Sequence, residues 1–154
     1  MWQGRLNSFI AAAKERFFIN GVLWERACET HFNCDKDQFC FKGFLAQYMA
    51  TTTQLAPYTA GEIFPLLAST AKAAASFCNQ GADNNQCTMW WTQPDGPATI
   101  GVGQQMSALN VFNANMIKFK EDSVTTADTG GTSQGDPSAG SNPSDQQPMY
   151  VTIL

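Results

Sequence analysis

Two stretches of the sequence carry the residue types that could do chemistry, and both are marked by cysteines. The first covers residues 28–43 and the second residues 78–104. Each contains two cysteines within a polar segment that leads into an apolar, helix-like run. This spacing predicts one disulfide in each stretch, which would stabilise the fold by about 2–3 kcal/mol through restriction of the unfolded chain. The expected pairs are Cys28 with Cys34 and Cys78 with Cys87.

A metal site is the alternative for the first stretch. His31 lies midway between Cys28 and Cys34, and Cys40 follows, which is a spacing typical of zinc ligands. We favour the disulfide interpretation, because five cysteines in so short a chain are typical of an oxidising compartment. It leaves Cys40 unpaired and His31 as a loop residue, and it implies neither a metal nor a cofactor.

Carboxylates beside the cysteines could act on a glycosidic bond, a reaction that usually needs one carboxyl group as acid and another as nucleophile or base. Asp35 and Asp37 form the local pair, and Asp83 and Asp95 lie in the second stretch. Asp35 or Asp37 could instead cap the helix that follows, where an acidic group complements the helix dipole. The sequence leaves both interpretations open.

Three further side chains could contact a sugar. Trp90 and Trp91 lie among polar residues, and their rings could stack on a sugar ring or be buried against helix ends. Lys42 lies one turn into an apolar helix and could donate to a ligand hydroxyl, pair with Asp37 or remain solvated. We find no Gly-rich phosphate loop and no Ser/His/Asp arrangement in the sequence.

Apolar residues at helical spacing predict four helices that position these segments. Asn20 and Gly21 are expected to end the first helix in left-handed conformations. Gly43 lies inside the second helix, where it costs roughly 1 kcal/mol against alanine unless a backbone or ligand approaches closely. The predicted helices cover residues 2–18, 38–54, 59–77 and 101–119.

The third helix carries two local signals. Thr59 and Glu62 match a capping box, and Pro65 predicts a kink or a later helix start. The connection before it is short, whereas the segments before the second and fourth helices are long. In an antiparallel stack this alternation places both long loops at one end, where sites are usually built. That loop end is therefore the candidate functional face.

Bulk properties limit the classes of function. The chain has 154 residues, a net charge of −4 and only nine scattered Lys and Arg, which excludes a nucleic-acid binding protein. No segment approaches the ~20 apolar residues of a membrane span, and no signal peptide is visible. Because the cysteine content is typical of a secreted protein and no signal peptide is visible, we expect the chain to be a fragment of a secreted protein. Residues 1–120 are expected to be folded, and residues 121–154, rich in Ser, Thr, Gly and Pro, to form a disordered tail.

Ordered motifs in the chain resemble the C-terminal part of glycoside hydrolase family 76, the fungal endo-α-1,6-mannanase-like cell-wall proteins. The resemblance extends over roughly residues 2–139. The motifs are Ala27-Cys28-Glu29, Cys34-x-x-Asp37-Gln38-x-x-Phe41-Lys42, Thr53-Gln54-Leu55-Ala56-Pro57-Tyr58, Ala71-Lys72-Ala73-Ala74-Ala75, Gly101-Val102-Gly103-Gln104-Gln105-Met106-Ser107-Ala108-Leu109 and the Ala127–Pro137 segment.

The resemblance implies an all-α partial (α/α)6 barrel of two helical hairpins with long disulfide-bearing loops. The first and third helices would lie in the outer ring, and the second and fourth in the inner ring. The long loops would then face a cleft for α-1,6-mannan. From this topology, the substrate-binding candidates are the residues at the junctions of loops and inner helices: Asp37, Lys42, Trp90, Trp91 and Gln104.

The family's adjacent Asp-Asp catalytic pair is missing from the sequence. We therefore assign no catalytic residue to this chain and expect it to be inactive alone, although its parent would be a glycosidase or transglycosidase of fungal cell-wall biogenesis. A non-catalytic, secreted mannan-binding or interaction module is the alternative. The resemblance also implies a monomer at the cell surface, held at the plasma membrane by a glycolipid anchor in full-length relatives. Few apolar residues follow Pro148, so we expect that anchor signal to be incomplete.

Overall fold

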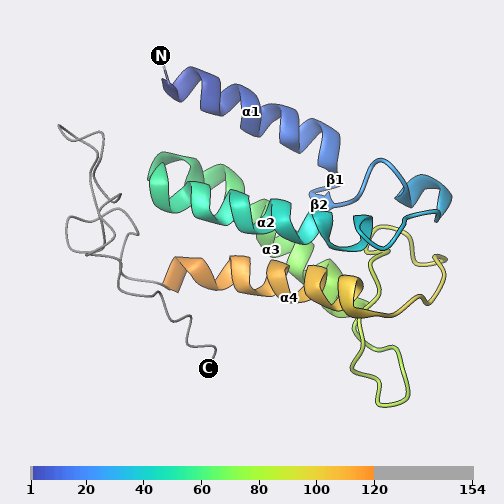
Figure 1. The fold of residues 1–154 in the computed structure, drawn as a ribbon. Coiled ribbons are helices and arrows are strands. Elements are labelled where there is room, and N and C mark those ends of the chain that lie inside the picture. Colours follow the sequence, from blue (N-terminus) through green and yellow to red (C-terminus); the bar gives the residue numbers. More distant parts are fainter. Residues whose placement is uncertain (1, 120–154) are drawn as a thin grey trace, which may run out of the picture. The chain divides into compact units, whose positions relative to one another are not determined.

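The computed structural model describes residues 2–119, and four α-helices dominate this part (Figure 1). All four predicted helices are confirmed, with ends that differ from the expected ones by a few residues at most. Short 3-10 helices occupy Glu29–His31, Pro57–Thr59 and Ile117–Phe119. The predicted tail, residues 121–154, lies outside the described residues. The helices are α1 (Trp2–Phe17), α2 (Gln38–Leu55), α3 (Ala60–Ser76) and α4 (Val102–Met116).

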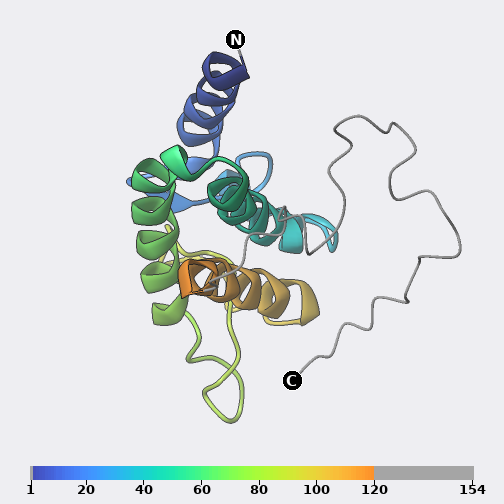
Figure 2. The same ribbon diagram turned by 90° about the vertical axis from the view of Figure 1, so that its left-hand side faces the viewer.

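The arrangement of the helices confirms the expected alternation of long loops and a short turn. Helices α1 and α3 run in one direction and α2 and α4 in the other, so both long loops lie at one end (Figure 1). The short connection between α2 and α3 lies at the opposite end. Helix α3 packs against both α2 and α4 (Figure 2). The position of the four helices in an (α/α)6 barrel stays a prediction.

A small hairpin follows α1 where the sequence analysis expected only a helix end. Strands β1 (Phe18–Ile19) and β2 (Val22–Leu23) pair antiparallel. Asn20 and Gly21 both have positive φ, at 52° and 79°. Their predicted left-handed conformation is confirmed, but it forms the two-residue turn of a hairpin, for which Asn-Gly is the strongest short sequence signal.

The contact between α2 and α4 explains the glycine inside α2. A Cβ atom at Gly43 would lie 2.7 Å from Cα of Ser107, closer than real Cβ contacts allow. The helices are also joined by hydrogen bonds, from Oγ of Ser107 to the carbonyl oxygen of Phe39 (2.7 Å) and from Nε2 of Gln47 to that of Asn110 (2.9 Å). The expected close approach of another backbone is therefore confirmed.

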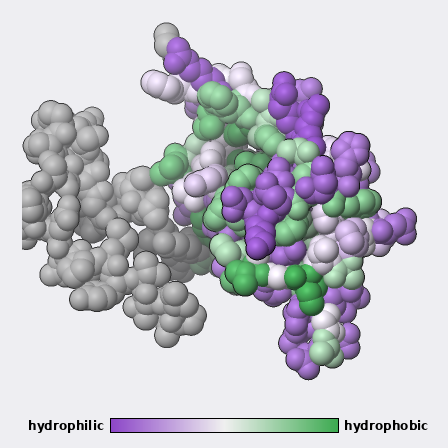
Figure 3. Space-filling model, turned by 45° about the vertical axis from the view of Figure 1, so that its right-hand side comes forward, coloured by the Kyte–Doolittle hydropathy of each residue, from purple (hydrophilic) through white to green (hydrophobic). Residues whose placement is uncertain are grey.

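Most large apolar residues of α2 and α4 lie outside the core, although Met49 and Val111 belong to it. Tyr48 is 70% exposed, and Val102 and Leu109 of α4 are also exposed. The buried faces consist mostly of small or polar residues, because the two helices approach too closely for larger side chains. Figure 3 shows hydrophobic residues at the surface of the described part, between hydrophilic ones.

The structure corrects the expected start of α3 in two respects, while the kink expected at Pro65 stays a prediction. The Thr59 side chain does not cap the helix; its Oγ1 donates to the carbonyl oxygen of Ala56 at 2.8 Å, because Thr59 lies in the preceding 3-10 turn. Pro65 also does not delay the helix, which begins at Ala60. No helix within residues 2–119 has the length and apolar character needed to cross a membrane.

Candidate functional site

Both predicted disulfides are present at the loop end. Cys28 is bonded to Cys34, and Cys78 to Cys87. A cystine sulfur is not a thiolate ligand, so the structure favours the disulfide interpretation over the zinc site. Cys40 is free among the described residues, as expected, and its Sγ contacts the carbonyl oxygen of Asp37 at 3.0 Å.

The two cysteine loops lie against each other at this end. The ring of Phe32, in the first loop, meets the ring of Trp90, in the second, edge to face with centroids 5.1 Å apart. Gly96 lies so close to Trp90 that an added Cβ would be 2.7 Å from its side chain. Segments far apart in sequence are thus joined into one structured surface.

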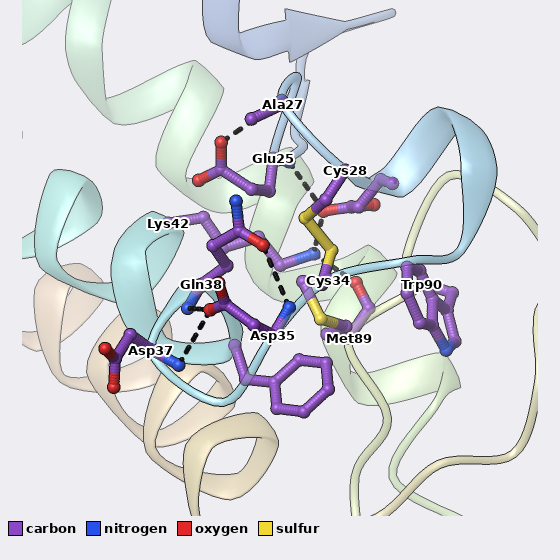
Figure 4. The surroundings of a disulfide bond; sticks show 12 residues. Glu25, Ala27, Cys28, Cys34, Asp35, Asp37, Gln38, Lys42, Met89 and Trp90 are labelled. Atoms are coloured by element: carbon purple, nitrogen blue, oxygen red, sulfur yellow. Dashed lines mark hydrogen bonds and ion pairs between the residues drawn. A yellow bond between two sulfur atoms is a disulfide. The ribbon is translucent and has the colours of Figure 1, made fainter.

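A buried ion pair lies below the two loops. Nζ of Lys42 is 2.7 Å from Oε1 of Glu29, and both side chains are at most 1% exposed. The ammonium group also donates to the carbonyl oxygen of Met89 in the second loop and lies 3.9 Å from the centroid of the Trp91 ring. The expectations of a solvated Lys42 or a pair with Asp37 are therefore wrong. Lys42 instead joins α2 to both loops (Figure 4).

The carboxylate of Glu29 fixes the entrance to the first loop. Its Oε1 accepts from the backbone N–H of Glu25 at 2.6 Å as well as from Lys42. Its Oε2 has no hydrogen-bond partner among the described residues. A buried carboxylate with one open acceptor depends strongly on its remaining partners, because an uncompensated buried charge is costly.

Burial shifts two ionisation equilibria in this cluster. The pKa of Lys42 is lowered because burial removes water from the ammonium group, although the negative charge of Glu29 opposes the shift. The pKa of Glu25 is raised, chiefly by burial and further by the charge of Glu29, against a hydrogen bond from Ala27 and the charge of Lys42. Glu25 thus holds a proton more readily than an ordinary surface carboxyl group.

The capping interpretation is confirmed for Asp35. Its Oδ1 accepts from the backbone N–H groups of Asp37 and Gln38, both at 3.1 Å, at the start of α2. The side chain of Gln38 returns a contact to the backbone N–H of Asp35 at 2.9 Å. Asp37 makes no side-chain cap and is exposed, so its carboxylate is available at the surface (Figure 4).

The remaining sequence candidates lie in the interior. Trp90 and Trp91 are 2% and 4% exposed, so the structure shows the burial alternative for both rings. Their indole N–H groups donate to Oγ1 of Thr99 (3.2 Å) and to the carbonyl oxygen of Thr88 (2.8 Å). Gln104 is also buried, in the first turn of α4. Only Asp37 among the five candidates is exposed.

A groove beside the ion pair was not foreseen from the sequence. It has a volume of about 370 Å³ and lies between the C-terminal end of α1, the segment after β2, and α2. Aromatic rings and the Glu25 carboxyl group line it together, which suits a ligand with both apolar faces and hydroxyl groups. The sequence signal that could have indicated the groove is Trp24-Glu25, which directly follows the hairpin turned at Asn20 and Gly21. The lining residues are Phe17, Trp24, Glu25, Phe41, Lys42, Phe44, Leu45 and Tyr48.

Comparison with known proteins decides the family. The pattern described as Glycosyl hydrolase family 76 matches residues 1–128. The chain belongs to glycosyl hydrolase family 76. The resemblance stated from the motifs is therefore confirmed.

Three relatives of this family 76 chain are named as mannan endo-1,6-alpha-mannosidases, the first of them as a putative one. It is 41% identical over 142 residues to a protein of Schizosaccharomyces pombe, covering 91% of this chain and 32% of that protein. It is 35% identical over 143 residues to the mannan endo-1,6-alpha-mannosidase DFG5 of Saccharomyces cerevisiae, covering 93% of this chain and 31% of the relative. The mannan endo-1,6-alpha-mannosidase DCW1 of Candida glabrata is 34% identical over 154 residues, covering 99% and 34%. The chain thus spans about a third of the length of these relatives.

A solved structure supports the fold of the family 76 chain. The crystal structure of Dfg5 from Chaetomium thermophilum in complex with glucosamine matches with a TM-score of 0.75 at 28% identity. The match covers 87% of this chain and 36% of that one. No cluster of three or more His, Cys, Asp or Glu within residues 2–119 is arranged to hold a metal ion.

Proposed function

We propose that this chain forms part of a glycosidase or transglycosidase that acts on α-1,6-mannan, and that its loop end contributes to the sugar-binding surface rather than to bond cleavage. The observation that carries the proposal is the joining of the two cystine loops above a buried ion pair, in a member of family 76. The names of the relatives supply the substrate class.

The bond-breaking groups would come from outside these residues. The sequence has no adjacent Asp pair, and Asp35, two positions before Asp37 in the sequence, is engaged as a helix cap. Glu29 is held in the interior by Lys42. The chain alone would therefore bind sugar without cleaving it.

The predicted substrate-binding residues divide into two roles. Asp37 would contact sugar hydroxyls directly, because its carboxylate is exposed at the loop end. Lys42, Trp91 and Gln104 would act as positioning residues, because they are buried, and Lys42 holds both loops from below. Trp90 is buried as well and would hold the first loop through its contact with Phe32. The groove at Glu25 adds a direct contact, in which the Glu25 carboxyl group hydrogen-bonds to a hydroxyl and the Trp24 and Tyr48 rings face the sugar.

A secreted or cell-surface location follows from the same proposal. Two disulfides in the described part suit an oxidising compartment, where such bonds persist. Attachment of the full-length protein to the plasma membrane through a glycolipid anchor, and a monomeric state, belong to this proposal as expectations from the resemblance.

An NMR titration of the chain with α-1,6-mannotriose tests the sugar-binding role. The indole N–H signal of Trp24 reports on the groove, and its shift should saturate with sugar. Glu25→Ala and Tyr48→Ala should weaken this response, whereas the isomeric α-1,4-linked glucotriose should give a smaller one. A Trp24 signal that does not move with mannotriose, in a chain whose other signals are dispersed, would contradict the proposal. A non-catalytic mannan-binding module is the alternative function, favoured if this chain binds but confers no cleavage on a relative.

A further inference from the structure

A second pocket lies in the second cysteine loop, away from the groove at Glu25. It has a volume of about 310 Å³, at the small end of the range for ligand sites. It lies between the C-terminal end of α3 and the segment that follows Thr88. Its residues include Asn79, Gln80, Thr88 and Trp90. None of them belongs to the lining of the groove.

The chemistry of this pocket is polar and uncharged. Its lining consists of amide, hydroxyl, aromatic and small side chains, without an ionisable one. Oγ1 of Thr88 is buried and has no hydrogen-bond partner among the described residues. Nε2 of Gln80 donates to Oδ1 of Asn79 at 2.6 Å, so this bond does not use the amide N–H groups of Asn79. Such a lining can donate to and accept from hydroxyl groups but cannot neutralise a charged ligand.

The walls of the pocket are fixed before any ligand arrives. The Cys78–Cys87 disulfide and the paired backbones of Gln80 and Gln86 close the loop at its base. The backbone N–H of Thr88 donates to the carbonyl oxygen of Phe77 at 3.0 Å. A pocket held in this way loses little conformational entropy on binding, which favours even a small ligand.

We propose that this pocket is an accessory binding site for a single neutral sugar residue. Hydroxyl groups of the sugar would supply the partner that Thr88 lacks and would accept from Asn79. Trp90 would contribute an apolar wall. The site is separate from the groove, so it would hold a second residue of a glycan or a branch of it. The proposal depends on the proposed function only for the choice of a mannoside as probe.

The test is a titration of the whole chain with methyl α-D-mannopyranoside, followed by the indole N–H signal of Trp90 in NMR spectra. We expect a saturable shift. Thr88→Val, which keeps the shape but removes the hydroxyl, should weaken the affinity roughly threefold to tenfold, and Asn79→Ala should act similarly. Methyl glucuronide, which carries a charge, should bind more weakly than the mannoside.

Tyr48→Ala is the matched control, because this residue lines the groove and not the pocket. This change should leave the response of Trp90 to methyl α-D-mannopyranoside unchanged, while it should weaken the response of Trp24 to α-1,6-mannotriose. A Trp90 signal that does not move, or that moves equally in wild type, Thr88→Val and Asn79→Ala, would overturn the accessory site. A Trp24 signal that does not respond to mannotriose, beside an intact Trp90 response, would overturn the proposed function and leave the accessory site standing.

Discussion

Replacement of Lys42 by methionine should strongly destabilise the described part of the chain. The side chain keeps most of its length, but the ammonium group that lies 2.7 Å from Glu29 is lost. Glu29 would then remain buried with Oε2 already unpartnered, and only the backbone N–H of Glu25 would contact its other oxygen. Removal of one partner from a buried pair costs about 3–5 kcal/mol. This is a large part of the roughly 5–15 kcal/mol that stabilises an ordinary domain.

The double variant Glu29→Gln, Lys42→Met separates the charge effect from the packing effect. It removes both charges and keeps the volume, so most of the lost stability should return, because a neutral amide costs far less to bury than an uncompensated carboxylate. Urea unfolding, followed by tryptophan fluorescence, gives the free energy of unfolding for the wild type, both single variants and the double variant. The reasoning is refuted if Lys42→Met costs less than about 1 kcal/mol, or if the double variant is no more stable than Lys42→Met.

Three further predictions concern the glycine contact, the raised pKa and the disulfide. Gly43→Ala should destabilise the chain by roughly 1–2 kcal/mol in urea unfolding, because overpacking against Ser107 exceeds the gain in helix propensity. Gly61→Ala is the control: a Cβ atom added there has no neighbour within 4 Å, so this change should be neutral or slightly stabilising. Because the pKa of Glu25 is raised in the folded protein, its contribution to stability is fully present below its ordinary pKa of 4.5 and is lost as the pH rises through the folded pKa. The wild type should therefore lose stability above about pH 4.5 relative to Glu25→Gln, as measured by thermal unfolding. An equal pH dependence of the two proteins would contradict this. Replacement of Cys78 and Cys87 together by serine should cost about 2–3 kcal/mol, while Cys40→Ser should change the unfolding free energy by less than about 0.5 kcal/mol; equal effects would be evidence against the disulfide.

Local signals in the sequence were sufficient for the helices, the disulfides and the common end of the loops. Helix periodicity and cysteine spacing act over few residues, and the alternation of long and short connections follows from them. Asn20 and Gly21 show the limit of such signals, since the same left-handed preference serves a helix end and a hairpin turn. Pairing of the following strand, β2, decides between a helix end and a hairpin turn, and that strand has only two residues.

The ion pair and the groove could not be derived in the same way. Glu29 meets Lys42 because a 3-10 turn after Cys28 directs its side chain inward, and no periodic pattern marks that turn. The groove at Glu25 depends on how α1 and the segment after β2 lie against α2. The buried faces of α2 and α4 were also hidden from hydropathy, because close approach at Gly43 favours small residues over large apolar ones.

A chimeric enzyme tests the central claim most directly. Residues 1–128 of this chain would replace the matching third of the mannan endo-1,6-alpha-mannosidase DFG5 of Saccharomyces cerevisiae, and cleavage of α-1,6-mannan would be measured. We expect the chimera to cleave mannan, and the Asp37→Ala chimera to do so with weaker substrate binding and unchanged stability. A folded chimera that neither binds nor cleaves α-1,6-mannan would contradict the account.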